Sequence, residues 1–246
     1  MIINFKQFEK IQLSAQKDYT IEDFYQFFGS NMSKDEVDKI LCGIIEEYKL
    51  DVDTTDLRLL GNGMYGFAFL LSNPKIGKSV VMKITTDNNE YQNAIKIVGE
   101  RPKFIAHHYD ARVLGVKMKD ELIELLNKSD KKYYVILLEK LQTFEDEELS
   151  DITEIISWYK EYKTNADDNV EDQLHLRVLS VDTDINYIHD LSNMESECHE
   201  YGIPFTDIHS ENVGLKNSNI ARFDIGWDAY DYYEYDLEPI KINIQP

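Results

Sequence analysis

Apolar residues recur at helical spacing near the start of the chain. The positions that share this helical face are Val37, Ile40, Leu41, Ile44, Ile45 and Tyr48. Their spacing of three or four residues predicts an amphipathic helix. Ser33 stands three positions before Glu36, a capping-box pattern that marks the start of this helix. We therefore expect residues 1–56 to form a helical extension that packs against the rest of the protein.

From residue 57 onward the apolar positions form short runs of the kind that build strands. These runs cover residues 57–60, 67–71, 79–85, 111–116 and 133–138. The first two flank a glycine-rich segment and predict a hairpin. Residues 87–100, which follow the third run, are compatible with a helix. The pattern therefore predicts a five-stranded sheet with one helix inserted after its third strand.

The second half of the chain returns to helical spacing. Residues 145–162 are acidic and amphipathic, and apolar positions recur every three or four residues over 181–201. Gly202 and Pro204 should end the second of these helices. Beyond them, apolar residues on either side of a turn at 217–219 predict two short strands next to a polar loop.

The charge balance limits the partners that this chain can have. Lys and Arg number 26 and Asp and Glu number 46, which gives a formal net charge of −20. Binding to a nucleic-acid backbone needs clustered Lys and Arg, and so does binding to an anionic membrane surface. We therefore expect neither nucleic acid nor a membrane among the partners.

The cysteines and the apolar runs indicate a cytoplasmic protein. Two cysteines, Cys42 and Cys198, are too few for a disulfide framework or a four-sulfur metal site. The first residues lack the apolar run of a signal peptide, and no stretch approaches the roughly 18 apolar residues of a membrane helix. We expect a protein of the reducing cytoplasm.

The segment GNGMYG and the strand after it carry the first candidate chemistry. Glycines at this spacing let backbone amides approach a ligand closely, and a concavity of such amides suits a phosphate. Lys83 lies within an apolar run, where a charge is costly unless it has a partner or a wet face. Glu90, on the predicted helix, is the favoured partner, and Glu100 is the alternative.

A second group of polar residues follows the long helix. Asp207 and Asn212 lie in the segment DIHSEN, and Asp224 opens the segment DIG after an apolar run. A carboxylate and an amide oxygen are hard ligands that suit Mg²⁺. A further carboxylate can orient or deprotonate a hydroxyl nucleophile. Singly each residue is typical of a turn or a cap, but their order along the chain favours a shared site.

Together these segments resemble the protein-kinase-like superfamily. GNGMYGFAF resembles its glycine-rich nucleotide loop, VVMKI its third-strand lysine motif, DIHSEN its catalytic loop and DIG its metal-binding DFG motif. The resemblance runs from about residue 57 to residue 226 with the elements in the same order. The D-x-H-x-x-N loop is more similar to those of aminoglycoside and choline kinases than to those of regulated protein kinases.

The resemblance implies a role for each matching residue. Asp207 would be the catalytic base or would orient the acceptor hydroxyl, and Asn212 and Asp224 would bind Mg²⁺. Lys83 would contact the α- and β-phosphates of ATP, with Glu90 as its salt-bridge partner. The other implied nucleotide-binding residues are Gly61, Asn62, Gly63 and Gly66 in the glycine loop and Glu139 and Leu141 in the hinge beside adenine.

The resemblance also implies the fold and its divisions. We expect an α+β protein with a two-lobed protein-kinase-like fold. Residues 1–56 would be the helical extension, 57–141 an N-lobe with a five-stranded antiparallel sheet and one helix, and 142–246 a reduced, mainly helical C-lobe. We expect the 20 residues after Gly226 to be too few for an activation segment and the usual late helices.

The expected function is ATP- and Mg²⁺-dependent transfer of a γ-phosphate to a hydroxyl of a protein or small molecule. Two alternatives stay open. A kinase fold can transfer AMP instead, because the motifs do not determine which phosphorus atom is attacked. A non-catalytic pseudokinase, or an acidic module that covers a basic partner, is consistent with the net charge of −20.

Overall fold

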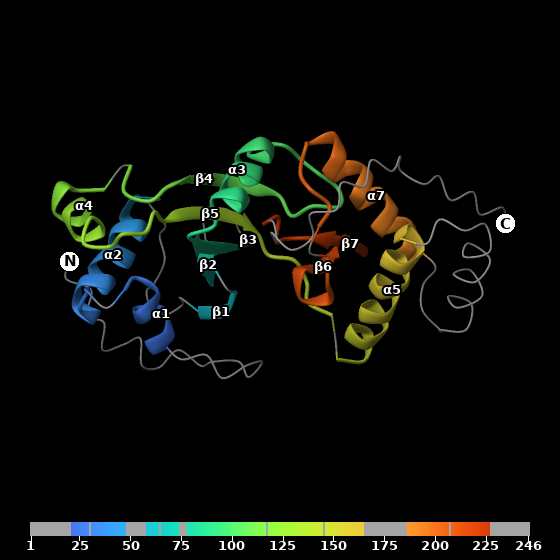
Figure 1. Cartoon of the computed structure of the whole chain (residues 1–246), viewed down its shortest axis with the longest axis horizontal. Helices are drawn as coiled ribbons and strands as arrows, with labels where there is room; N and C mark the ends of the chain where they lie inside the picture. Colours follow the sequence, from blue (N-terminus) through green and yellow to red (C-terminus); the bar gives the residue numbers. More distant parts are fainter. Residues whose placement is uncertain are drawn as a thin grey trace. The chain divides into compact units, whose positions relative to one another are not determined.

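The computed structural model describes most of the chain, which divides into two compact units. The described residues are 21–29, 31–47, 58–63, 65–73, 78–116, 118–144, 146–164, 186–206 and 208–226. Unit 1 comprises the described residues of 1–99 and 108–140, and unit 2 comprises those of 100–107 and 141–246. Figure 1 shows the helices and strands of both units. The chain is therefore an α+β protein, as the sequence predicts.

Unit 1 contains a five-stranded antiparallel sheet, in the order β1-β2-β3-β5-β4, within the described residues. Its strands are Arg58–Gly63, Gly66–Asn73, Lys78–Thr85, His108–Val113 and Tyr134–Glu139 for β1 to β5. Helix α3, Asn88–Ile97, follows β3. The predicted sheet with one helix after its third strand is confirmed.

Two features of unit 1 differ from the sequence prediction. The strand expected at 111–116 is β4, which ends at Val113, because Gly115 has φ +98° and turns the chain. Helix α4, Asp120–Leu126, was not predicted. It is seven residues long, only Leu122 is buried in it, and Lys119 provides no side-chain cap, so its length and its N-cap give only a weak sequence signal.

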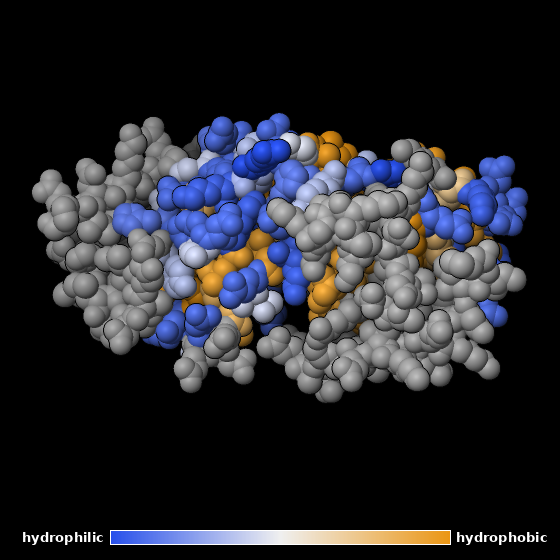
Figure 2. All heavy atoms as spheres, turned by 180° about the vertical axis from the view of Figure 1, so that it is seen from behind, coloured by the Kyte–Doolittle hydropathy of each residue, from blue (hydrophilic) through white to orange (hydrophobic). Residues whose placement is uncertain are grey.

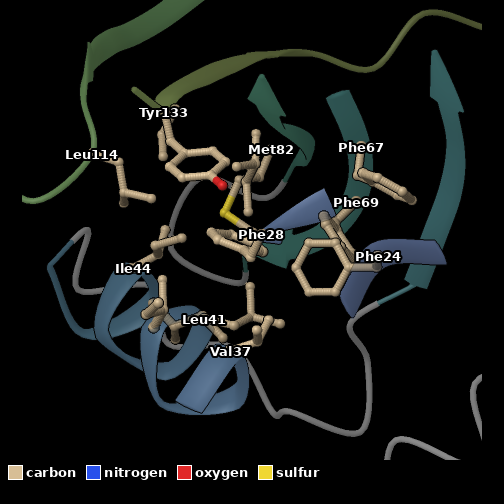
Figure 3. Packing of buried hydrophobic residues seen from close by; sticks show 14 of the residues in the cluster. Phe24, Phe28, Val37, Leu41, Ile44, Phe67, Phe69, Met82, Leu114 and Tyr133 are labelled. Carbon is tan, nitrogen blue, oxygen red and sulfur yellow. The ribbon is translucent and has the colours of Figure 1, made fainter. Parts of the chain in front are cut away.

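Helices α1, Ile21–Phe27, and α2, Lys34–Glu47, cover one face of the sheet. Alternate residues of β2 and β3 point to them, which is the period of a strand with one buried face. Phe24 of α1 packs edge-on against Phe67 and Phe69 of β2, with ring centroids 5.3 and 5.1 Å apart. Figure 3 shows this shared core. Each large side chain buried there contributes roughly 1.5–3 kcal/mol.

Within its described residues, unit 2 combines two α-helices and the 3₁₀ turn Ser210–Asn212 with a short hairpin. The elements are α5, Asp146–Thr164; α7, Asn186–Glu200; and strands β6, Val213–Lys216, and β7, Asn219–Arg222. The predicted helix end at Gly202 is confirmed, because Gly202 adopts φ +62° and its amide donates to the carbonyl of His199 at 3.0 Å. Residues 181–185 of the predicted helix lie outside the described residues.

Polar contacts, of which the Asp190 bond is buried, join α7 to the rest of unit 2. Asp190 accepts a hydrogen bond from the amide of Ile220 in β7 at 2.8 Å. Glu197 accepts hydrogen bonds from the amides of Lys103 and Phe104 at 2.7 and 2.6 Å. These bonds place residues 102–106 and β7 against the same helix. The β6–β7 hairpin is thereby attached to α7.

Hydrophilic side chains are prominent on the face of the molecule shown in Figure 2. Blue, hydrophilic side chains cover much of the coloured area on the face in Figure 2, with apolar side chains gathered in smaller areas between them. None of the helices in the described ranges combines the length and the apolar character needed to cross a bilayer.

Candidate functional site

The structure pairs Lys83 with Glu90 inside unit 1. The Nζ atom of Lys83 on β3 lies 2.5 Å from Oε1 of Glu90 on α3, and the two side chains are 16% and 4% exposed. Glu100, the alternative partner, is exposed and lies beyond the end of α3. Burial of a charge is costly unless a partner compensates it, and Glu90 supplies that compensation for Lys83.

The start of α3 holds Glu90 in this position. The carboxylate of Asp87 caps the helix by accepting a hydrogen bond from the amide two residues later at 2.7 Å. Tyr134 of β5 donates to the side chain of Asn88 at 2.8 Å and stacks on Tyr91 with ring centroids 4.3 Å apart. Burial, and then the charge of Asp87, raise the pKa of Tyr134. The first turn of α3, which contains Glu90, is therefore fixed to the sheet.

Lys83 lies among aliphatic side chains on a face of the sheet that also carries Thr85 of the same strand. Ala68 of β2 and Ile136 of β5 lie directly opposite it in the sheet register. Its neighbour two residues back, Val81, lies opposite Leu70 and Leu138. Side chains opposite one another in a sheet share a face. This arrangement sets one ammonium group beside a strip of aliphatic side chains.

The glycine-rich segment forms the hairpin between β1 and β2. Gly61, Asn62 and Gly63 belong to β1 and Gly66 opens β2. A side chain at Gly66 would place its Cβ 2.5 Å from the carbonyl oxygen of Ile84. Gly66 is thus required for the close approach of β2 to β3, a packing role that the sequence did not reveal. Contact between these residues and a nucleotide stays a prediction.

Hydrogen bonds tie the tip of this hairpin to the start of α3. The carbonyl oxygen of Tyr65 accepts from the hydroxyl of Thr85 at 3.1 Å and from the amide and hydroxyl of Thr86 at 2.8 and 3.2 Å. Thr85 is fully buried, and its hydroxyl also accepts from the amide of Asp87 at 3.0 Å. Sequence reasoning missed this contact, because a threonine at the end of a strand is not a distinctive signal.

Unit 2 contains the second group of predicted site residues. Asn212 is buried, and its carbonyl accepts a hydrogen bond from the amide of Phe223 at 3.1 Å. This bond extends the pairing of Val213 with Arg222 and sets residues 212 and 224 at the same end of the β6–β7 hairpin. Asp224 is half-buried, and its Oδ1 atom accepts from the amide of Gly226 at 3.0 Å. Asp207 lies outside the described residues.

The donors at this hairpin end fit Mg²⁺ by their chemistry. A carboxylate and an amide oxygen are the hard ligands that Mg²⁺ takes in proteins, together with water and phosphate oxygens. No three His, Cys, Asp or Glu side chains gather as a metal-binding group within the described ranges. The fit therefore rests on Asn212 and Asp224.

Arg222 is a buried cation between these loops that sequence reasoning missed. Its Nε atom donates to the carbonyl of Asp224 at 2.9 Å, and its terminal nitrogens donate to the carbonyls of Pro204 and Thr206 at 2.9 and 3.2 Å. Nη1 also lies 3.8 Å from the sulfur of Cys198, whose pKa is raised mainly by burial. The available signal was an arginine inside the apolar run IARF.

The predicted hinge residues follow β5. Glu139 is the last residue of β5 and lies opposite Val80. Leu141 belongs to unit 2 and is buried. Directly after it, Gln142 and Leu215 exchange backbone hydrogen bonds at 3.1 and 2.8 Å. The segment after β5 therefore runs alongside β6.

No protein-family model matches the chain, and no curated protein is significantly similar to it in sequence. The proposal that follows therefore depends on the residues and contacts described above.

Proposed function

We propose that the chain is an ATP- and Mg²⁺-dependent phosphotransferase with a two-lobed protein-kinase-like fold. The observation that carries the proposal is the ion pair between Lys83 of β3 and Glu90 of α3, next to the aliphatic residues around Val81. A buried ion pair is weak evidence for stability, because the desolvation of both charges offsets their attraction. An ammonium kept beside an aliphatic strip instead suits a ligand that has an apolar planar base and an anionic tail.

Each described residue would act by binding or orienting. Lys83 would bind oxygens of the α- and β-phosphates, and Glu90 would hold its side chain in one rotamer. The aliphatic residues around Val81 would contact the base, whose edge would bond the backbone at Glu139 to Leu141. Burial of a flat, apolar ring against aliphatic side chains supplies binding energy in proportion to the area removed from water.

The transfer itself would need little covalent help from the protein. The acceptor's hydroxyl oxygen would attack the γ-phosphorus, the bond from that phosphorus to the bridging oxygen would break, and ADP would leave. Asp207 would orient the hydroxyl and accept its proton. Asn212 and Asp224 would hold Mg²⁺, which when bound neutralises charge on the phosphate oxygens.

Nucleotide-dependent stabilisation tests the proposal. ATP with Mg²⁺ should raise the Tm of the wild-type chain, since a ligand present at 100 times its Kd adds about 2.7 kcal/mol to stability. Lys83→Met should abolish the shift. Lys119→Met is the matched control, because Lys119 also pairs with a glutamate in unit 1 but is exposed, and it should retain the shift.

Two results would contradict the proposal. One is a wild-type Tm that ATP and Mg²⁺ do not change, and the other is a Lys83→Met variant whose Tm rises with ATP and Mg²⁺ as much as that of the wild type. Intact-mass measurement of an acceptor after incubation with ATP and Mg²⁺ would then separate phosphate transfer from AMP transfer. Binding of nucleotide without any transfer would favour a non-catalytic role.

A further inference from the structure

We propose that Arg222 is a positioning residue that holds the two loops of the candidate metal site in one arrangement. The consequence for nucleotide binding rests on the proposed function. The claim about the two loops does not, because it concerns contacts within unit 2.

The three carbonyl groups that Arg222 binds belong to these two loops. Pro204 and Thr206 precede the segment DIHSEN, and the carbonyl of Thr206 is the last one before Asp207. The third carbonyl belongs to Asp224, a proposed metal ligand. One guanidinium group therefore connects the entrance of the first loop to the start of the second.

The backbone of Arg222 is itself fixed on both sides. Its amide donates to the carbonyl of Phe104 at 3.0 Å, and its carbonyl accepts from the amide of Ala106 at 2.8 Å. The side chain is fully buried. An anchored backbone leaves the guanidinium little freedom, so the positions of its nitrogen atoms define where the three carbonyls lie.

Asp224 is held from two directions as a result. Arg222 fixes its carbonyl, and the amide of Gly226 donates to its carboxylate. A ligand group whose orientation is set by outer contacts binds a metal more tightly, and loss of such a contact typically costs 10- to 100-fold in metal affinity, as a rough guide. The carbonyl contact thus acts on metal binding through Asp224.

Lysine cannot take over this role. A guanidinium is planar and presents five N–H donors in a rigid fork, whereas an ammonium is a compact point charge on a flexible stem. A lysine in place of Arg222 would keep the positive charge but would lose the fork that reaches three separate carbonyls. The Arg222→Lys variant therefore separates geometry from charge.

Hydrogen exchange with mass spectrometry on the full chain tests the loop claim. Arg222→Lys should speed exchange at the amides of Asn212, Phe223 and Gly226, all of which are hydrogen-bonded in this region. Lys163→Met is the matched control: Lys163 is also a largely buried cation of unit 2, but its Nζ atom pairs with Glu195 of α7 at 3.0 Å. It should leave those three amides unchanged.

Titration of Mg²⁺ at saturating ATP tests the consequence. If the wild type binds the metal–nucleotide pair, Arg222→Lys should need at least about tenfold more Mg²⁺ for half of the Tm shift, and Lys163→Met should not. A wild type that binds no nucleotide would contradict the proposed function. The hydrogen-exchange result would still test whether Arg222 holds the two loops in place.

Three outcomes would overturn the inference. One is an Arg222→Lys variant whose exchange at the three amides matches the wild type. Another is faster exchange spread evenly over unit 2, which would indicate a general loss of stability. The third is failure of Arg222→Lys to fold, which would make Arg222 a residue needed for folding rather than for positioning.

Discussion

At the scale of single residues, buried polar atoms determine how the turns of unit 1 are held. Thr85 is an example, because its hydroxyl donates to the carbonyl of Tyr65 and accepts from the amide of Asp87. Removal of the hydroxyl would leave the amide of Asp87 without this acceptor, whereas the carbonyl of Tyr65 would keep its two hydrogen bonds from Thr86. Leaving a buried polar group without a partner costs more than the hydrogen bond itself contributes.

Thr85→Val should therefore lower the free energy of unfolding by about 1–3 kcal/mol. Valine has nearly the shape of threonine, so packing is retained and the effect isolates the hydroxyl. Thr85→Ser is the control, since serine keeps the hydroxyl and should cost less. Urea unfolding of both variants gives the comparison, and equal stabilities would exclude a role for this hydroxyl.

Asp38 of α2 makes the stability of unit 1 depend on pH. Burial raises the pKa of its carboxyl from 3.8 to about 6, even though the hydroxyl of Tyr25 donates to it at 2.9 Å. Between these two values the folded chain binds more protons at this position than the unfolded chain does. Stability from this group is therefore present at low pH and falls as the pH rises.

The variant Asp38→Asn should remove this part of the pH dependence. From pH 4 to about pH 6, the free energy of unfolding of the wild type should fall relative to that of the variant. Above about pH 6 the difference should be constant, with the variant more stable. Parallel slopes across the whole range would show that Asp38 titrates equally in the folded and unfolded states.

At the scale of elements, the core is made by helices from the first 47 residues packing on strands that follow them. Phe24 contributes to this contact from α1 and is 1% exposed. It touches Phe28 of the same region and two aromatic rings of β2. The helices are thus part of the folded body of unit 1 rather than an attachment to it.

Phe24→Ala should destabilise the protein by about 3–5 kcal/mol, because a cavity replaces a fully buried aromatic ring. Ile95→Ala is a suitable control, since Ile95 lies on α3 and is 44% exposed. It should change stability by much less. Thermal unfolding monitors both, and a small effect of Phe24→Ala would mean that α1 does not contribute to the cooperative core.

At the scale of the whole molecule, the chain has a net charge of −20. The candidate site residues of its two units nevertheless include buried cations. Self-repulsion from such a charge disfavours compact states but supports solubility. Lys83 and Arg222 are two of the 26 Lys and Arg residues, and both are held by acceptors inside their own unit. Cations that are bound by acceptors of their own unit are suited to positioning other groups of the protein rather than to attracting an anionic partner to its surface.

Local pattern was sufficient for much of the fold. Hydrophobic periodicity predicted the order of strands and helices in unit 1, and Gly202 predicted a helix end, because both depend on interactions between residues near in sequence. The capping pair of Ser33 and Glu36 was also readable: the backbone amide and the hydroxyl of Ser33 donate to the Glu36 carboxylate at 2.8 and 3.0 Å. Helix α4 escaped prediction because it is short and lacks such signals.

The sequence by itself determined the α+β class, the five-stranded sheet and the candidate residues, since strand period, turn residues and charges inside apolar runs can be read along the chain. Only the tertiary structure decided that Glu90 rather than Glu100 pairs with Lys83, that Gly66 is required by the carbonyl of Ile84, and that Arg222 joins two loops. These are contacts between segments brought together by folding. The distances between these segments depend on tertiary packing, which cannot be predicted from the spacing of residues along the chain.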